Sequence, residues 1–197
     1  MSKIDHKLTR DDVMDMDAYA LVRNDRRSAM TVMKKDRRVH IGPDATAYFE
    51  SFDTMWHQIH EMLYIEKGGE AQIQDELNAY APLVPNGQEL VCTLMFEIDD
   101  EFRRGKFLST LGGVEHTVCL RVDGTEIKAV AEDDIDRTTA AGKASSIQFL
   151  HFPFTEHLIE KFCDPKAETI FVIEHENYGH MAILSLQTKR ALASDFT

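Results

Sequence analysis

The chain has 197 residues, a hydrophobic fraction of 43% and a formal net charge of −12 at pH 7. A chain of this size and composition can bury enough apolar surface to fold by itself, which excludes a disordered chain and a disulfide-stapled mini-protein. The acidic charge disfavours nucleic acid as a partner, because affinity for phosphate backbones comes largely from cations that release counterions.

The cysteines and the N-terminus indicate a reducing compartment. Cys92, Cys119 and Cys163 lie far apart without C-x-x-C spacing, so we expect buried thiols rather than disulfides or metal ligands. The N-terminal residues lack the apolar stretch of a signal peptide, and no run approaches the ~20 apolar residues of a membrane span. We therefore expect a cytoplasmic protein with no membrane partner.

The charge is unevenly distributed along the chain. Residues 1–43 carry a net charge of +3, and residues 44–197 carry −15. Such a basic segment could dock an acidic protein surface, but a solvated helix face or pairing with the acidic body is the preferred interpretation. The basic cluster consists of Arg23, Arg26, Arg27, Lys34, Lys35, Arg37 and Arg38.

The first half of the chain is expected to be rich in helix. Thr9, followed by acidic residues, is typical of a helix N-terminus. Apolar periodicity predicts helices over residues 10–22, 25–36, 53–66 and 71–80, and a hairpin of strands at 39–41 and 45–49 interrupted by Gly42-Pro43. The proline-containing connector 81–87 is the best internal boundary.

The second half is expected to be rich in strand. Asp123-Gly124 predicts a tight hairpin, because glycine tolerates the positive φ of a primed turn. The predicted strands are 89–98, 117–122, 126–131, 146–154, 169–175 and 180–186, with helices at 99–111 and 155–162 and a long loop at 132–145. Neighbouring strands joined by tight turns favour an α+β fold with a predominantly antiparallel sheet, helices packed on one face and an N-terminal helical segment. We expect a single domain over residues 1–197, helix-rich over residues 1–85 and strand-rich over residues 86–197.

The predicted helix 53–66 carries a possible metal motif, His57, His60 and Glu61, because residues three and four apart converge on a helix. The order H-x-x-H-E matches neither H-E-x-x-H nor H-x-x-E-H. Met55, Ile59, Met62 and Leu63 share one sector of the helical projection, while His57, His60 and Tyr64 lie opposite. A solvated face is therefore the preferred interpretation of these histidines.

Other polar residues in apolar patterns leave two interpretations open. Glu66 falls inside the apolar sector and Gln58 on its edge, so Glu66 either lies in water at the helix end or contributes a carboxylate to a pocket. His175 and His180 bracket the predicted turn 176–179 and could face each other across the hairpin. His151 is interpreted as structural. No G-x-S-x-G elbow, P-loop or G-x-G-x-x-G motif occurs.

The sequence resembles an uncharacterised bacterial family known as a domain of unknown function. The resemblance rests on residues 7–12, Arg38-Val39, Gly42-Pro43, Phe49-Glu50, Gln58-Ile59, Glu61-Met62, Glu66, 76–80, 82–85, His175 and Tyr178. Members are typically encoded beside rubrerythrin-like proteins and an iron–sulfur protein related to heterodisulfide reductase subunits. The resemblance marks Glu50, Gln58, Glu61, Glu66, His175 and Tyr178 as candidate pocket residues, without assigning them a catalytic role.

Three functions follow as hypotheses. The leading one is an accessory or partner protein of an iron–sulfur or rubrerythrin-type redox system, which docks through the acidic body or the basic N-terminal helix. The second is a metal-dependent enzyme or sensor in which Glu61 and His175 help to bind a divalent Fe, Mn or Zn ion, and it requires the candidate residues to converge. The third is a small-ligand regulatory module, which requires a closed apolar pocket.

Overall fold

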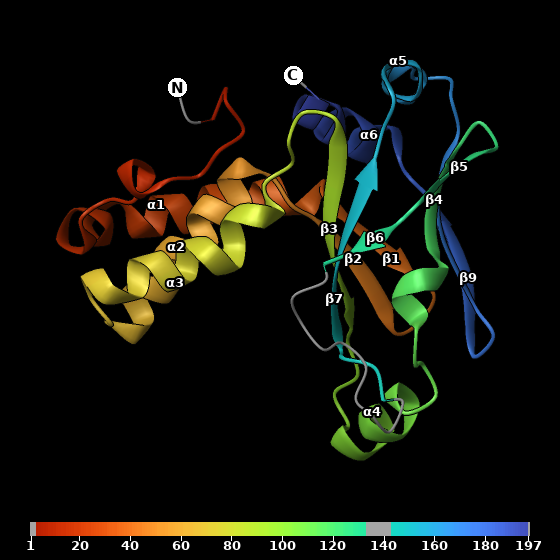
Figure 1. The fold of residues 1–197 in the computed structure, drawn as a ribbon, viewed down its shortest axis with the longest axis horizontal. Helices are drawn as coiled ribbons and strands as arrows, with labels where there is room; N and C mark the ends of the chain where they lie inside the picture. The colour runs from red at the N-terminus through yellow and green to blue at the C-terminus, as the bar shows by residue number, and fades with distance from the viewer. Residues whose placement is uncertain (1–2, 133–142, 197) are drawn as a thin grey trace.

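The computed structural model describes residues 3–132 and 143–196 (Figure 1). The α-helices are α1 (Met16–Lys35), α2 (Phe52–Glu66), α3 (Glu70–Tyr80), α4 (Glu101–Leu108), α5 (Glu156–Cys163) and α6 (Leu186–Ala193). The strands are β1 (Arg38–Ile41), β2 (Ala45–Phe49), β3 (Glu89–Phe96), β4 (Val118–Val122), β5 (Thr125–Lys128), β6 (Val130–Ala131), β7 (Ile147–Pro153), β8 (Thr169–His175) and β9 (Tyr178–Ile183). Of the loop predicted at 132–145, residues 133–142 lie outside the described residues.

The strands form two antiparallel sheets. Sheet A has the order β1-β2-β3-β7-β6, and sheet B has the order β5-β4-β8-β9. Within both sheets the paired strands are antiparallel. The predicted α+β fold class is confirmed, and the strands divide between two sheets. No helix in the described stretches of the chain is long and apolar enough to cross a membrane.

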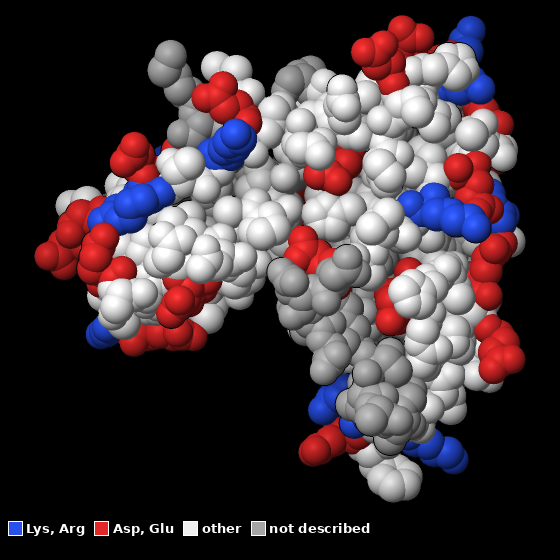
Figure 2. All heavy atoms as spheres, in the orientation of Figure 1, with Lys and Arg blue, Asp and Glu red and all other residues white. Residues whose placement is uncertain are grey.

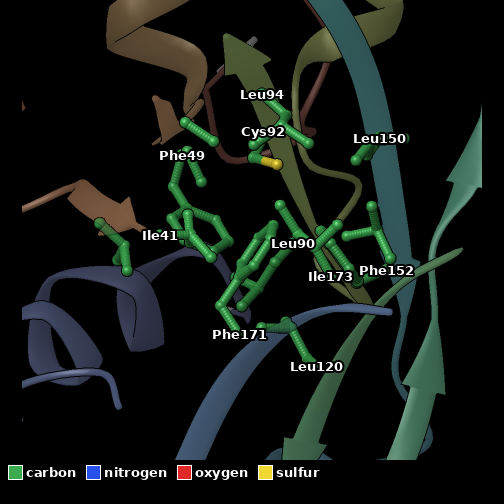
Figure 3. Packing of buried hydrophobic residues seen from close by; sticks show 14 of the residues in the cluster. Ile41, Phe49, Leu90, Cys92, Leu94, Leu120, Leu150, Phe152, Phe171 and Ile173 are labelled. Atoms are coloured by element: carbon green, nitrogen blue, oxygen red, sulfur yellow. The ribbon is translucent and has the colours of Figure 1, made fainter. Parts of the chain in front are cut away.

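The main hydrophobic core lies between the two sheets (Figure 3). Leu90, Cys92 and Leu94 of β3 are completely buried, on the face that the period-two pattern predicts. They belong to one cluster with Leu120 of β4 and Phe171 of β8 in sheet B. Cys119 is also buried, but Cys163 at the end of α5 is exposed, so the expectation of three buried thiols is wrong at that position.

Helices α1, α2 and α3 form a separate layer beside sheet A (Figure 1). Ile59 and Leu63 on the predicted apolar stripe of α2 pack with Leu77 of α3 and with Val91 of β3. Val91 alternates with the core residues of β3, so the helices cover the opposite face of that strand. Strand β3 is therefore buried on both faces where the helices lie.

The N-terminal region forms one long helix rather than the two that the sequence predicts. Asp15 caps α1 by accepting hydrogen bonds from the Asp17 and Ala18 amides. The polar residues Asn24, Asp25, Arg26 and Arg27, which interrupt the apolar pattern, are exposed and do not break the helix. Only Tyr19 and Met30 of α1 are buried, so its apolar pattern was too sparse to show its length.

The Asp123-Gly124 hairpin is confirmed, with positive φ angles of 45° and 78° at its two turn residues. The strand predicted at 126–131 is split, because β5 pairs with β4 in sheet B whereas β6 pairs with β7 in sheet A. The terminal hairpin has a tighter turn than predicted. Its register pairs His175 with Tyr178, so Tyr178 belongs to β9.

Candidate functional site

Helix α1, rather than solvent, covers the histidines of α2. His60 is completely buried, and His57 and Glu61 are half-buried. The expectation of a solvated histidine face is therefore wrong. A helical projection identifies the residues that share one side of α2, but it cannot show that a second helix packs on the polar side.

Both ring nitrogens of His60 are satisfied by backbone groups. The Met14 amide donates to Nε2 at 3.0 Å, so Nε2 carries the lone pair. Nδ1 then donates to the Trp56 carbonyl at 2.6 Å. Burial lowers the pKa of His60, which keeps the ring neutral. With its single lone pair already occupied, this imidazole serves as a structural tie between α2 and the segment that leads into α1.

Glu61 is held by α1. Arg23 donates from Nε to Oε1 and from Nη2 to Oε2, both at 2.8 Å, and the Tyr19 hydroxyl donates to Oε1 at 2.8 Å. The hydrogen bonds from Arg23 lower the pKa of Glu61. Burial and the hydrogen bond to Glu61 raise the pKa of Tyr19. We call His57, His60, Glu61, Tyr19 and Arg23 the α1–α2 polar cluster, and it clamps the two helices together.

Glu50 forms a second closed arrangement, between β2 and α2. It is buried, and its carboxylate accepts from the Thr93 hydroxyl at 2.7 Å and from the Thr54 hydroxyl at 2.6 Å. The carboxylate lies just before the N-terminus of α2, where the helix dipole favours negative charge. Its two hydroxyl contacts join α2 to β3.

The remaining two candidates on α2 face solvent to different degrees. Glu66 is the last residue of the helix, is exposed, and accepts a hydrogen bond from Gln72 at 2.7 Å. Gln58 is half-exposed. Of the two interpretations of Glu66, the structure supports a carboxylate in water at the helix end.

Tyr178 organises the opposite side of the molecule. Its buried hydroxyl donates to the Ile41 carbonyl at 2.6 Å and accepts from the Asp44 amide at 3.0 Å. Gly42, in the same turn, has a φ of +67°, and a Cβ there would lie 2.8 Å from the Tyr178 hydroxyl and 2.6 Å from Cγ of His180. The Gly42-Pro43 motif therefore reflects close packing of this turn against β9.

His175 lies at the end of β8 and also supports a turn. Its Nδ1 accepts from the Asn177 amide at 3.2 Å, and the Asn177 side chain donates to the Thr110 carbonyl at 2.9 Å. His175 and His180 do not face each other, because the register pairs His175 with Tyr178 and His180 with Ile173.

The six candidate residues occupy three separate places. Glu61, Glu66 and Gln58 lie along α2, Glu50 lies between α2 and sheet A, and His175 and Tyr178 lie in sheet B (Figure 1). Glu61 and His175 belong to different layers, so the structure does not bring the predicted metal pair together. Within residues 3–132 and 143–196, no group of three His, Cys, Asp or Glu side chains could hold a metal ion.

A more open arrangement lies at the end of the molecule formed by α4. A depression of about 390 Å³ is lined by Phe102, Arg103, Lys106, Phe107 and Thr110, which we call the α4 platform. The Phe102 side chain is 84% exposed. Figure 2 shows an uncharged tip at this end with both basic and acidic atoms near it.

The residues of the Gly42 turn and of the terminal hairpin hold the α4 platform in place. Phe107 packs edge-on against Tyr178, with ring centroids 5.6 Å apart. Nη2 of Arg103 donates to both carboxylate oxygens of Asp44, at 2.7 and 2.8 Å. Two of the candidate pocket residues, His175 and Tyr178, thus contact the elements that support this surface.

Sequence reasoning predicted the α4 helix but assigned no function to it. A signal was present, because Phe102 and Phe107 lie five positions apart, about 140° around a helix, and cannot both face one core. A second arrangement was also missed. His151, interpreted as structural, is bonded to Glu89 and Glu132 at 3.0 Å each.

A cavity of about 680 Å³ lies where α1, α2 and the C-terminal residues meet. Its wall includes Arg37, which forms a buried ion pair with Asp195 and also donates to the carbonyls of Phe49, Glu50 and Ala191. Arg37 and Arg23 of the basic cluster are therefore paired inside the molecule, as the preferred interpretation of that cluster predicts.

The comparisons with known proteins agree with this architecture. The family model described as a protein of unknown function, DUF3501, matches residues 7–196. The search of curated proteins gives no match. A crystal structure of a novel protein of unknown function from Burkholderia pseudomallei has a TM-score of 0.88 and 37% sequence identity, and the alignment covers 97% of this chain and 100% of that chain. The chain therefore belongs to the DUF3501 family, whose function is unknown.

Proposed function

We propose that the protein is a non-catalytic partner of an iron–sulfur or rubrerythrin-type redox protein, and that the α4 platform docks an acidic segment of that partner. The observation that carries the proposal is the 84% exposure of Phe102 beside the basic side chains of Arg103 and Lys106. The class of partner comes from the family resemblance, and the docking chemistry comes from these residues.

An exposed phenylalanine that shares a depression with two basic side chains has the composition of a binding hot spot. Burying a Phe side chain contributes about 1.5–3 kcal/mol. Aromatic and arginine residues are enriched among the residues that dominate protein interfaces. The cations select an acidic partner, because complementary charges accelerate association and exclude wrong partners. Arg103 uses Nη2 for Asp44, and its other donors remain available in a side chain that is 58% exposed.

The platform is held in one shape before any partner binds. Asp44 fixes Arg103, and the turn that carries Asp44 is itself tied to the Tyr178 hydroxyl. A surface that is already ordered loses less conformational entropy on binding, so more of the contact energy appears as affinity.

The polar residues elsewhere support a partner role over catalysis. His60, Glu61 and Glu50 each have their hydrogen-bonding groups engaged by internal partners. The chain has three cysteines, and two of them are buried in different regions of the core. It cannot supply the four thiolates of a usual iron–sulfur cluster, so the electrons would belong to the partner.

The test is binding of the purified protein to the rubrerythrin-like protein and to the iron–sulfur protein encoded beside family members, measured by calorimetry at 50, 150 and 500 mM salt. We expect binding to one of them that weakens with salt. Phe102→Ala should reduce affinity about 30-fold, and Lys106→Glu about tenfold.

Matched controls on α1 separate docking from a general surface effect. Leu21 is 87% exposed and Lys35 is exposed, both far from α4 in the chain, so Leu21→Ala and Lys35→Glu should change affinity less than twofold. Failure of both redox proteins to bind at 100 µM would refute the partner role. Binding that Phe102→Ala and Lys106→Glu leave intact would refute the α4 platform as the docking surface.

A further inference from the structure

The carboxylate–imidazole–carboxylate arrangement at His151 lies on the face of sheet A that carries Val91 and Phe149. Nδ1 of His151 lies 3.0 Å from Oε2 of Glu89, and Nε2 lies 3.0 Å from Oε1 of Glu132. The three side chains are only 13–23% exposed. Each ring nitrogen therefore faces a carboxylate oxygen in a largely dehydrated position.

This geometry requires a particular protonation state. A carboxylate only accepts hydrogen bonds, so both ring nitrogens must donate, and only the imidazolium form has two N–H groups. In the neutral ring one nitrogen bears a lone pair, which would face a carboxylate oxygen at 3.0 Å and repel it. The neutral ring can therefore keep only one of its two carboxylate partners.

The two carboxylates differ in how firmly they are held. Glu89 begins β3, which lies inside sheet A between β2 and β7. Glu132 follows β6, an edge strand with two residue pairs to β7, Val130 with His151 and Ala131 with Leu150. One further backbone bond, from the Glu132 amide to the Phe149 carbonyl, extends this short ladder. Moving Glu132 therefore costs less free energy than moving Glu89.

Strand β6 also has a special place in the chain. It directly follows β5, so the chain crosses from sheet B to sheet A between Lys128 and Val130. The hydrogen bond between Nε2 of His151 and the Glu132 carboxylate thus holds the end of this crossover on sheet A. Val130 is 56% exposed, so of the two β6 residues only Ala131, a small side chain, packs against the core.

We propose that Glu89, His151 and Glu132 form a proton-operated clasp, which fastens β6 to sheet A while His151 is an imidazolium and releases Glu132 when the ring becomes neutral. The next carboxylate on the same face, Glu50, is already engaged by two threonine hydroxyls. On β5, which also packs near β7, Glu126 pairs with Arg121 in sheet B.

The direction of the switch follows from the same groups. Burial lowers the pKa of His151, but the hydrogen bonds and charges of Glu89 and Glu132 outweigh burial, so the pKa is raised above its ordinary value. The clasp is therefore closed below the ordinary imidazole pKa. It opens as pH rises through the raised value in the folded protein.

The test combines imidazole nitrogen NMR with hydrogen exchange of the Glu132 amide, which donates to the Phe149 carbonyl of β7, between pH 5 and 10, corrected for the intrinsic exchange rate. In the wild-type protein the protection of this amide should fall about tenfold as the His151 ring titrates, the effect of losing one charge-assisted hydrogen bond. Absence of a His151 titration in this range, or a titration with unchanged protection, would overturn the proposal.

Two variants distinguish a proton-operated clasp from a merely structural contact. In Glu89→Gln the amide N–H can donate to Nδ1 of the neutral ring, so Nε2 keeps its proton for Glu132 and protection should stay high at all pH values. In Glu132→Ala the bond is absent, and protection should be low at all pH values. The matched control is Glu97→Gln, which should behave like wild type. Glu97 is an exposed carboxylate that accepts a hydrogen bond from Tyr48. A Glu89→Gln protein that still loses protection with rising pH would contradict the mechanism.

Discussion

The α1–α2 polar cluster and the α4 platform differ in residue type and in exposure to solvent. The cluster holds His57, His60, Glu61 and Tyr19, the residue types from which catalytic and metal sites are made, and its hydrogen bonds join α2 to α1 and to the segment before α1. The platform holds phenylalanine and basic residues, and its Phe102 is 84% exposed. Availability to a partner, rather than residue type, distinguishes the two regions.

This difference has an energetic basis. A buried polar group costs free energy unless each donor and acceptor has a partner, so a folded cluster such as that of His60 and Glu61 tends to be fully paired. An exposed apolar side chain costs little in the free protein and contributes when it is covered. Substitutions in the cluster should therefore change stability, while those in the platform should change binding.

The largest expected effect is that of His60→Ala on stability. The substitution leaves a cavity beside Trp56 and removes the acceptor of the partly buried Met14 amide, so the free energy of unfolding should fall by about 3 kcal/mol. Urea unfolding followed by circular dichroism measures this. His157→Ala, at an exposed position on α5, should change stability by less than about 0.5 kcal/mol. Equal effects of the two variants would mean that the cluster does not hold α1 and α2 together.

The second-largest effect should combine a loss of stability with weaker binding at the α4 platform. Tyr178→Phe removes the hydroxyl that bonds the Ile41 carbonyl and the Asp44 amide, both buried contacts. We expect a loss of about 2 kcal/mol in the free energy of unfolding and weaker partner binding, because Asp44 positions Arg103. The measurements are urea unfolding and calorimetric titration with the redox partner. Unchanged affinity at reduced stability would show that the platform does not depend on this turn.

The sequence could predict the elements whose signals are local. Asp123-Gly124 specified a turn by its own conformational preferences, and the alternation of Leu90, Cys92 and Leu94 specified the buried face of β3. The environment of His60 could not be predicted, because it depends on α1, which begins more than 40 residues earlier in the chain. The separation of Glu61 from His175 likewise follows from the topology. A motif match in the sequence does not give the distance between two residues that lie in different layers of the fold.

The third prediction concerns the polar cluster alone. Tyr19→Phe removes one of the three hydrogen bonds to Glu61 and leaves the two from Arg23, so stability should fall by about 1 kcal/mol. Tyr48→Phe is the matched control, because its hydroxyl bonds Glu97 at an exposed position, and its effect should be close to zero. Thermal and urea unfolding of both variants provide the comparison. A Tyr48→Phe effect as large as that of Tyr19→Phe would remove the distinction between the closed cluster and exposed contacts.

The smallest expected effect is a pH dependence that belongs to Glu61. Arg23 lowers the pKa of this carboxyl in the folded protein, so the folded state binds the proton less readily than the unfolded chain does. The stabilisation is therefore complete above the ordinary carboxyl pKa and is lost as pH falls through the lower, folded value. Glu61→Gln should flatten the decline of stability between about pH 5 and pH 3 by less than about 1 kcal/mol, the range of a partly exposed ion pair. Urea unfolding at half-unit pH intervals measures the slope, and Glu160→Gln on the exposed face of α5 serves as the control. An unchanged slope in Glu61→Gln would mean that the Arg23 contact orients the two helices without stabilising them, because only a pKa difference between the folded and unfolded states makes stability depend on pH.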